Sequence, residues 1–130
     1  MEANSSKKKV LIIEDRKPII KALNIKLERS GFEVKMAEDG EAGLKALESD
    51  KFDLILLDIV LPKINGFTIL AEMQARKIDT PVIVLSNLSQ EEDARRAKEL
   101  GAKDYFIKSD ISINEVVKRV SRVLATENSN

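Results

Sequence analysis

Acidic, hydroxyl and ammonium side chains lie at the ends of four of the five short apolar runs in this sequence. Glu14 and Asp15 follow the first run, and Asp58 follows the third. Ser86 and Lys108 come at the ends of the fourth and the fifth. Three carboxylates in one place would repel one another and raise their pKa values unless a cation lay among them. Oxygen ligands with an incomplete shell suit Mg²⁺, which is completed by water and phosphate oxygens.

Each of these residues has an ordinary structural explanation when it is taken alone. Asp15 can cap a helix, Asp58 can end a strand and Ser86 can begin a loop. In open α/β sheets, however, ligands bind beyond the carboxyl ends of the strands, so the residues together predict one site. Histidine and cysteine are absent, so any chemistry must use carboxylates, hydroxyls and lysines.

The apolar runs alternate with segments of helical spacing, which predicts an α/β fold: a parallel sheet with helices on both faces. The expected strands are 10–13, 34–37, 54–57, 82–85 and 105–107. The runs that begin at 10, 54 and 82 are continuously apolar, as in strands buried on both faces, and should be central.

The last two helices differ in the apolar surface that they offer. The last helix, from residue 113 onward, has the widest apolar face and should be firmly docked. The fourth, at about 90–100, offers only Ala94, Ala97 and Leu100. Because small side chains bury little area, this helix should be weakly held and easily moved.

Composition indicates a single soluble domain without a membrane segment. The chain has 130 residues, of which 43% are hydrophobic and 34% charged, and 22 basic residues balance 22 acidic ones. This balance offers no general attraction to nucleic acid. The first nine residues lack the apolar stretch of a signal peptide, and the lysines at 7–9 are expected to be a solvated flank. We therefore expect a cytoplasmic protein.

The pattern resembles the receiver domains of response regulators, which are CheY-like proteins of two-component signalling. The matching pieces are LIIED, LILLDIVLPKINGF, VIVLS and GAKDYFIK, in the family's order and spacing. The resemblance implies a doubly wound, flavodoxin-like sheet of five parallel strands in the order 2-1-3-4-5, with five helices. We expect the receiver domain to span 9–126, with flexible tails at 1–8 and 127–130.

The resemblance also assigns the acidic residues. Asp58 is the phosphoacceptor and a Mg²⁺ ligand, Asp15 is a direct ligand, and Glu14 acts largely through metal-bound water. The backbone carbonyl of Val60 is a further ligand. The implied reaction is in-line phosphoryl transfer from a phosphohistidine on another protein, because this chain has no histidine. The donor would be a histidine kinase or a histidine phosphotransfer protein.

Three further residues have implied roles in transfer and switching. Lys108 and Ser86 contact the phosphoryl group, and Tyr105 turns inward when Ser86 moves. The fourth helix, fifth strand and fifth helix then form a changed face for a downstream protein target or for a homodimer. With no room for a DNA-binding domain after the last helix, we expect the output to be protein binding, unless the chain is part of a longer regulator.

Three positions depart from the family pattern or modify it. The family usually has a proline after the lysine, whereas Ser109 follows Lys108 here, so the geometry of that loop is open. Val60 and Leu88 occupy positions that flank the path of the hydrolytic water in the family, and both are apolar. Since apolar groups there do not orient water, we expect a long-lived phosphorylated state.

Three other functions are weighed against this interpretation. A haloacid-dehalogenase-like phosphohydrolase needs a second aspartate two residues after the nucleophile, and position 60 is valine. A flavin-binding module needs a Ser/Thr/Gly-rich loop after the first strand, which is missing. A pseudo-receiver that binds partners without phosphorylation remains the alternative. The expectation is thus a protein that catalyses only its own phosphorylation and dephosphorylation, and not a turnover enzyme.

Overall fold

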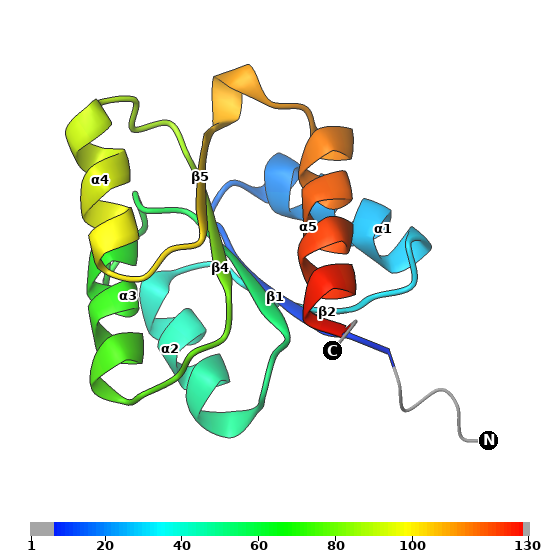
Figure 1. Ribbon diagram of the computed structural model, residues 1–130, viewed down its shortest axis with the longest axis horizontal. Helices are drawn as coiled ribbons and strands as arrows, with labels where there is room; N and C mark the ends of the chain where they lie inside the picture. Colours follow the sequence, from blue (N-terminus) through cyan, green and yellow to red (C-terminus); the bar gives the residue numbers. More distant parts are fainter. Residues whose placement is uncertain (1–6, 129–130) are drawn as a thin grey trace.

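The computed structural model describes residues 7–128 and contains a five-stranded parallel sheet (Figure 1). The strands are β1 (Lys9–Ile13), β2 (Glu33–Ala37), β3 (Leu54–Leu57), β4 (Val82–Ser86) and β5 (Asp104–Ile107). Their order in the sheet is β2-β1-β3-β4-β5, and every neighbouring pair is parallel. The predicted fold class and strand order are therefore confirmed.

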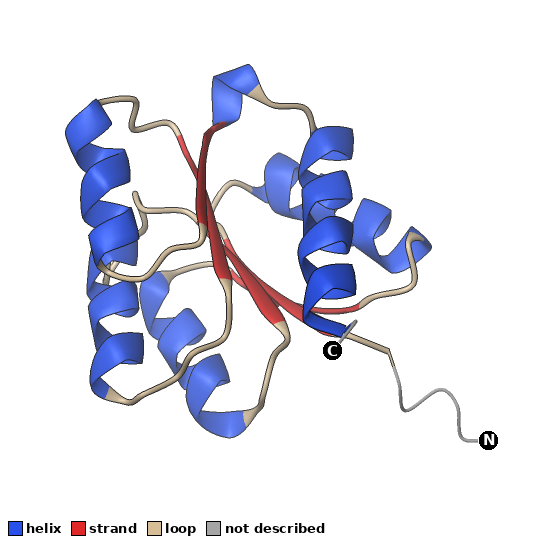
Figure 2. Cartoon of the chain, in the orientation of Figure 1, coloured by secondary structure: helices blue, strands red, loops and turns tan. Residues whose placement is uncertain are grey.

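Helices cover both faces of the sheet, as Figure 2 shows, and five of them are α-helices. They are α1 (Lys17–Arg29), α2 (Gly40–Ser49), α3 (Gly66–Ala75), α4 (Glu91–Glu99) and α5 (Ile113–Asn128). Helices α1 and α5 pack on one face, and α2, α3 and α4 pack on the other. Alternate residues of each strand point to opposite faces: Ile12 packs with α1 and α5, whereas Leu11 and Ile13 pack on the other side.

Burial separates the central strands from the edges of the sheet. All four residues of β3 and all five of β4 are buried, as are four of the five in β1. In β2 only Ala37 is buried, and every residue of β5 is partly exposed. The three continuously apolar runs are thus the three inner strands, as predicted, because both of their faces are covered by helices.

Helix α4 has little apolar contact with the rest of the domain. Ala97 is its one fully buried residue, while Ala94 is only partly covered. The Arg96 guanidinium lies 4.1 Å from the centre of the Phe67 ring in α3 and adds a cation–π contact. The predicted thin apolar stripe is confirmed, and α4 is held by few apolar groups.

The C-terminal helix is longer than its apolar pattern indicates. We expected the folded domain to end at 126, but α5 continues to Asn128. Residues 1–6 and 129–130 of the predicted tails lie outside the described residues. Within the described chain, no helix combines the length and the apolar character needed to cross a bilayer.

Candidate functional site

The carboxyl ends of the inner strands bring the predicted acidic residues together. Glu14 and Asp15 follow β1 directly, and Asp58 follows β3 directly. The sheet continues here as a ladder, since the Asp58 backbone N–H donates to the Ile13 carbonyl at 3.0 Å. One carboxylate oxygen from each of the three acids lies within 4.8 Å of the others. The acidic cluster predicted from strand ends is therefore present in the fold.

Lys108 projects from the end of β5 into this acidic cluster. Its ammonium nitrogen lies 2.7 Å from Glu14 Oε1 and 2.9 Å from Asp58 Oδ2. Glu14 is only 2% exposed and Asp58 only 5%. Burial raises the pKa of Glu14, and the hydrogen bond from Lys108 acts in the opposite direction. The contact between Lys108 and Glu14 was not anticipated from the sequence, where Lys108 was assigned to the phosphoryl group.

The donor set of this pocket fits a hard divalent cation. Glu14 and Asp58 are two buried carboxylates that share one ammonium, and the less buried Asp15 adds a third acid. Burying carboxylates with too few positive charges is costly, and a divalent ion in the pocket would offset this cost. Oxygen donors with free positions toward solvent are the arrangement that Mg²⁺ prefers. Glu14, Asp15 and Asp58 are the residues that would hold it.

Ser86 and Tyr105 are joined through the loop that connects β4 to α4. The buried Ser86 Oγ accepts a hydrogen bond of 3.3 Å from the Leu88 backbone N–H. The Tyr105 hydroxyl donates to the Leu88 carbonyl at 2.7 Å. Burial is the main cause of the raised pKa of Tyr105, so this hydroxyl stays a donor at neutral pH. The β4–α4 loop is therefore held at one residue, Leu88, from both sides.

The loop after β3 is shaped by close contact between backbone segments. The Val60 N–H donates to Asp58 Oδ1 at 3.3 Å, and the Val60 side chain is 57% exposed. Position 66 requires a glycine because there is no space for a side chain. A Cβ at Gly66 would lie 2.5 Å from the Asp58 carbonyl oxygen and 2.8 Å from Ile59 Cα. The first turn of α3 thus packs directly on the backbone of Asp58 and Ile59.

The segment after Lys108 forms a short turn without the family's usual proline. Residues Lys108–Asp110 make one 3₁₀ turn, and Ser109 is exposed. No cis peptide bond is found between residues 7 and 128. With serine and no cis peptide bond at position 109, the Lys108 ammonium still reaches Glu14 and Asp58.

Two residues near the site were not recognised from the sequence. Lys63 has a left-handed backbone with φ of 72°, and Gly40 lies against the loop that contains it. The turn-rich letters PKING in the loop from Asp58 to Asn65, here called the acceptor loop after the role expected of Asp58, were a signal for the first of these residues. No pattern in the sequence pairs this loop with the start of α2, because that contact depends on the tertiary fold.

Comparison with known proteins places this geometry in a family. The model of the response regulator receiver domain matches residues 10–121. The transcriptional regulatory protein PhoP for alkaline phosphatase synthesis of Bacillus subtilis is 40% identical over 117 residues, covering 90% of this chain and 48% of that protein. The response regulator SaeR of Staphylococcus aureus is 35% identical over 115 residues, covering 88% and 50%. The chain thus spans about half the length of the curated relatives it matches.

Solved structures agree with the sequence relatives. The receiver domain of the Francisella response regulator 1452 superposes with a TM-score of 0.87 at 30% identity, covering 93% of this chain and 99% of that one. The phosphorylated cyanobacterial phytochrome response regulator RcpA superposes with a TM-score of 0.78 at 29% identity, covering 91% of each. Sequence, sheet order and acidic edge all agree, and the chain belongs to the response regulator receiver domain family of two-component systems.

Proposed function

We propose that this receiver domain takes a phosphoryl group onto Asp58 with Mg²⁺ and changes its partner-binding face in response. The observation that carries the proposal is the placement of Asp58 beside Lys108 and two further carboxylates at the carboxyl edge of the sheet. A relative that superposes on this chain, RcpA, has been solved in a phosphorylated form. Family membership and site geometry therefore support the same function.

The residues of the pocket act by position and charge. A carboxylate oxygen of Asp58 attacks the phosphorus, the new O–P bond forms, and the P–N bond to the donor imidazole breaks. In this proposal Lys108, which donates to Asp58 at 2.9 Å, neutralises charge on the equatorial oxygens, and the buried Ser86 hydroxyl donates to one of them. When bound by Glu14, Asp15, Asp58 and the Val60 carbonyl, Mg²⁺ supplies further charge neutralisation. The product is an acyl phosphate and a free imidazole that takes a proton from solvent.

The change of state should pass from Ser86 to α4. If Ser86 Oγ turns toward a phosphoryl oxygen, the Leu88 N–H loses its acceptor and the loop to α4 is released. Tyr105 then loses the fixed Leu88 carbonyl that its hydroxyl now contacts, and can turn inward. Since few apolar groups hold α4, this helix can follow the loop at small cost.

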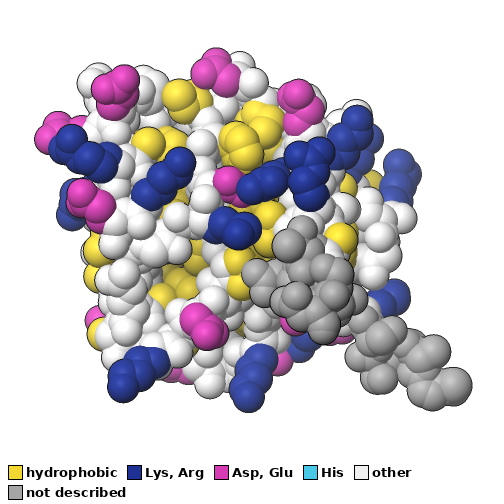
Figure 3. Space-filling view, viewed as in Figure 1, with side chains coloured by type: hydrophobic (Ala, Val, Ile, Leu, Met, Phe, Trp, Pro, Cys, Tyr) yellow, Lys and Arg dark blue, Asp and Glu magenta, His cyan; other side chains and the backbone are white. Residues whose placement is uncertain are grey.

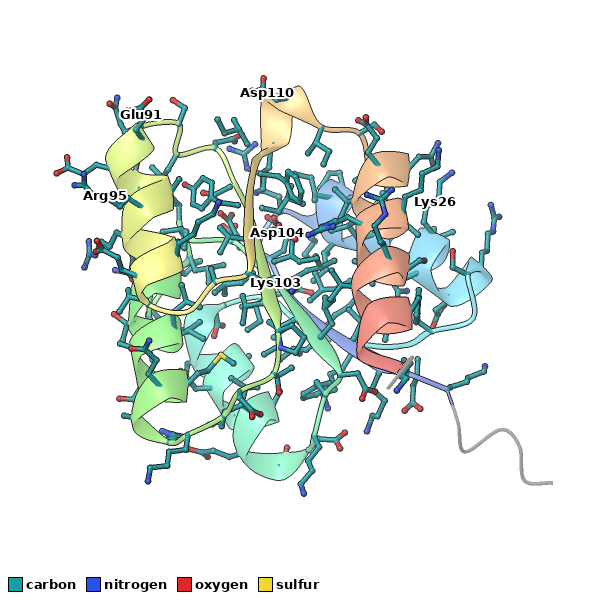
Figure 4. All side chains as sticks on the ribbon, viewed as in Figure 1. Lys26, Glu91, Arg95, Lys103, Asp104 and Asp110 are labelled. Carbon is teal, nitrogen blue, oxygen red and sulfur yellow. The ribbon has the colours of Figure 1, made fainter. Side chains whose placement is uncertain are left out.

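The proposed output surface is the face formed by α4, β5 and α5. In Figure 3 this face carries acidic and basic side chains around apolar patches. Figure 4 places Glu91 and Arg95 on α4, and Lys103 and Asp104 at the start of β5. The Arg119 guanidinium of α5 donates two hydrogen bonds, of 2.6 and 3.1 Å, to the Asp104 carboxylate. These bonds join α5 to β5 on this surface. Movement of α4 relative to this fixed pair would change the surface that a partner contacts.

The proposed partners follow from the family. The phosphoryl donor is a histidine kinase or a histidine phosphotransfer protein. The phosphorylated domain then binds a downstream protein target or a second copy of the chain. The relative PhoP of Bacillus subtilis is a transcriptional regulatory protein, and a role of this kind for the whole protein is part of the proposal. A cytoplasmic location remains a prediction.

Metal dependence tests the function directly. We expect a small acyl phosphate donor to add the mass of one phosphoryl group to the intact protein when Mg²⁺ is present, and peptide mapping to place it on Asp58. A chelator should abolish the addition, because the acidic cluster then repels the incoming phosphate. Absence of any addition at millimolar Mg²⁺, with the fold intact, would favour the pseudo-receiver alternative instead.

The lifetime of the phosphorylated state should depend on Val60 and Leu88. Val60 is exposed beside the acceptor, and Leu88 is partly buried in the β4–α4 loop. Neither side chain can orient a water molecule for attack, so we expect slow hydrolysis. The double substitution of Val60→Asn with Leu88→Gln should speed phosphate release about tenfold by placing polar groups there. The measurement is loss of the phosphoryl mass with time at neutral pH, with exposed Ile25→Asn as the control.

A further inference from the structure

Lys63 occupies a strained turn in the middle of the acceptor loop. The Ile64 N–H donates to the Pro62 carbonyl at 2.8 Å, and Lys63 between them has φ of 72°. This combination is a γ-turn with a positive φ, a conformation that residues with a side chain rarely adopt. Such a backbone persists only where the surrounding structure holds it.

The first turn of α2 holds the γ-turn in place. The Lys63 ammonium lies 3.4 Å from Glu41 Oε1 and 3.6 Å from Asp39 Oδ2. The Gly40 N–H donates to the Pro62 carbonyl at 3.2 Å. A Cβ at Gly40 would come within 1.8 Å of the Ile64 carbonyl oxygen, so the two backbones are in direct contact. The two ion pairs of Lys63 therefore add to a close backbone contact between Gly40 and Ile64.

Hydrogen bonds also fix the two ends of the acceptor loop next to Asp58. It begins at Asp58, and the Val60 N–H donates back to the Asp58 carboxylate at 3.3 Å. It ends where the Gly66 N–H donates to the Ile59 carbonyl at 2.8 Å. Between these two hydrogen bonds, Lys63 is the one residue of the loop whose side chain forms ion pairs among the described residues, and it forms two. The position of the Val60 carbonyl thus depends on a segment fixed at both ends and held in the middle by α2.

We propose that Lys63 is a positioning residue for phosphorylation, which holds the acceptor loop against α2 so that the Val60 carbonyl faces the acidic cluster. This inference rests on the proposed function. Lys63 does not reach the reacting atoms and acts only through the loop. At 59% exposure its ion pairs add little to global stability, so their effect should appear in the ordering of the loop.

Replacing Lys63 by asparagine separates positioning from stability. Asparagine tolerates a positive φ and has no ammonium, so Lys63→Asn relieves strain while it removes both ion pairs. We expect the midpoint of urea unfolding to stay the same or rise. The Mg²⁺ concentration for half-maximal binding should rise roughly two- to fivefold, the range that exposed ion pairs can supply. Lys63→Arg should restore the parent value, and Glu41→Gln should give a smaller rise.

The readouts are Mg²⁺ titration by NMR of the Val60 and Gly66 amides, urea unfolding, and phosphoryl incorporation from an acyl phosphate at low and at saturating Mg²⁺. The expected result is slower incorporation of Lys63→Asn at low Mg²⁺ and a rate equal to the parent's at saturation. Equal Mg²⁺ affinity in the parent, Lys63→Asn and Lys63→Arg would overturn the inference. If the parent itself took up no phosphate, the proposed function would be wrong. The NMR titration of Mg²⁺ binding would still test the positioning role of Lys63.

Discussion

Asp58→Asn will leave the domain folded and unable to take up a phosphoryl group. The amide has nearly the shape of the carboxylate, so the backbone contacts of Asp58 with Ile13 and Gly66 are kept. It is a very poor nucleophile toward phosphorus, and no other carboxylate at this edge directly follows β3. We expect incorporation from an acyl phosphate with Mg²⁺ to fall below detection by intact mass.

The same substitution should stabilise the metal-free protein. In the parent, Lys108 is the one ammonium shared by the buried carboxylates of Glu14 and Asp58. Neutralising Asp58 leaves one buried cation for one buried anion, which removes the repulsion that helps to keep the pKa of Glu14 raised. We expect the free energy of unfolding to increase by about 1 kcal/mol, as is common when a functional site is neutralised.

The matched control is Asp79→Asn, which changes an exposed aspartate at the opposite end of the sheet. It should incorporate phosphate like the parent and unfold at the same urea concentration. If Asp58→Asn still gained one phosphoryl group, the acceptor would be another residue, and the assignment of Asp58 would be wrong.

The fold was predictable because burial imposes a simple pattern on this sequence. The runs that begin at Val10, Leu54 and Val82 are continuously apolar, and each is an inner strand covered on both faces. The acidic cluster followed from the same reasoning, since residues after parallel strands meet at one edge. These features depend on side-chain type and order along the chain, which a sequence displays directly.

The details of the site were less accessible because they depend on contacts between distant segments. The Lys63 γ-turn uses a residue with no preference for a positive φ, and α2 holds it in place. The bridge from Lys108 to Glu14 arises because both are buried beside Asp58. Gly66 is required by the closeness of the Asp58 backbone, which composition cannot reveal.

Lys108→Met should have the opposite effect on stability to Asp58→Asn. Methionine keeps much of the apolar stem but removes the ammonium, so Glu14 and Asp58 remain buried without a cation. Removing one partner from a buried ionic cluster typically costs about 3–5 kcal/mol. We expect a loss of this size in metal-free urea unfolding, and a phosphorylation rate reduced by about 10² to 10³ at saturating Mg²⁺. Lys103→Ala, which changes an exposed lysine directly before β5, should change neither quantity.

Combining the two substitutions distinguishes charge balance from simple packing loss. If the cost of Lys108→Met arises from uncompensated carboxylates, it should be much smaller in the Asp58→Asn background, where only Glu14 remains charged in the contact with residue 108. Mg²⁺ should likewise restore more stability to Lys108→Met than to the double variant, because the ion binds the folded acidic cluster and its affinity depends on both carboxylates. Equal costs in both backgrounds would mean that Lys108 and Asp58 are not coupled energetically, and that the pocket does not depend on a balance between its acids and its cation.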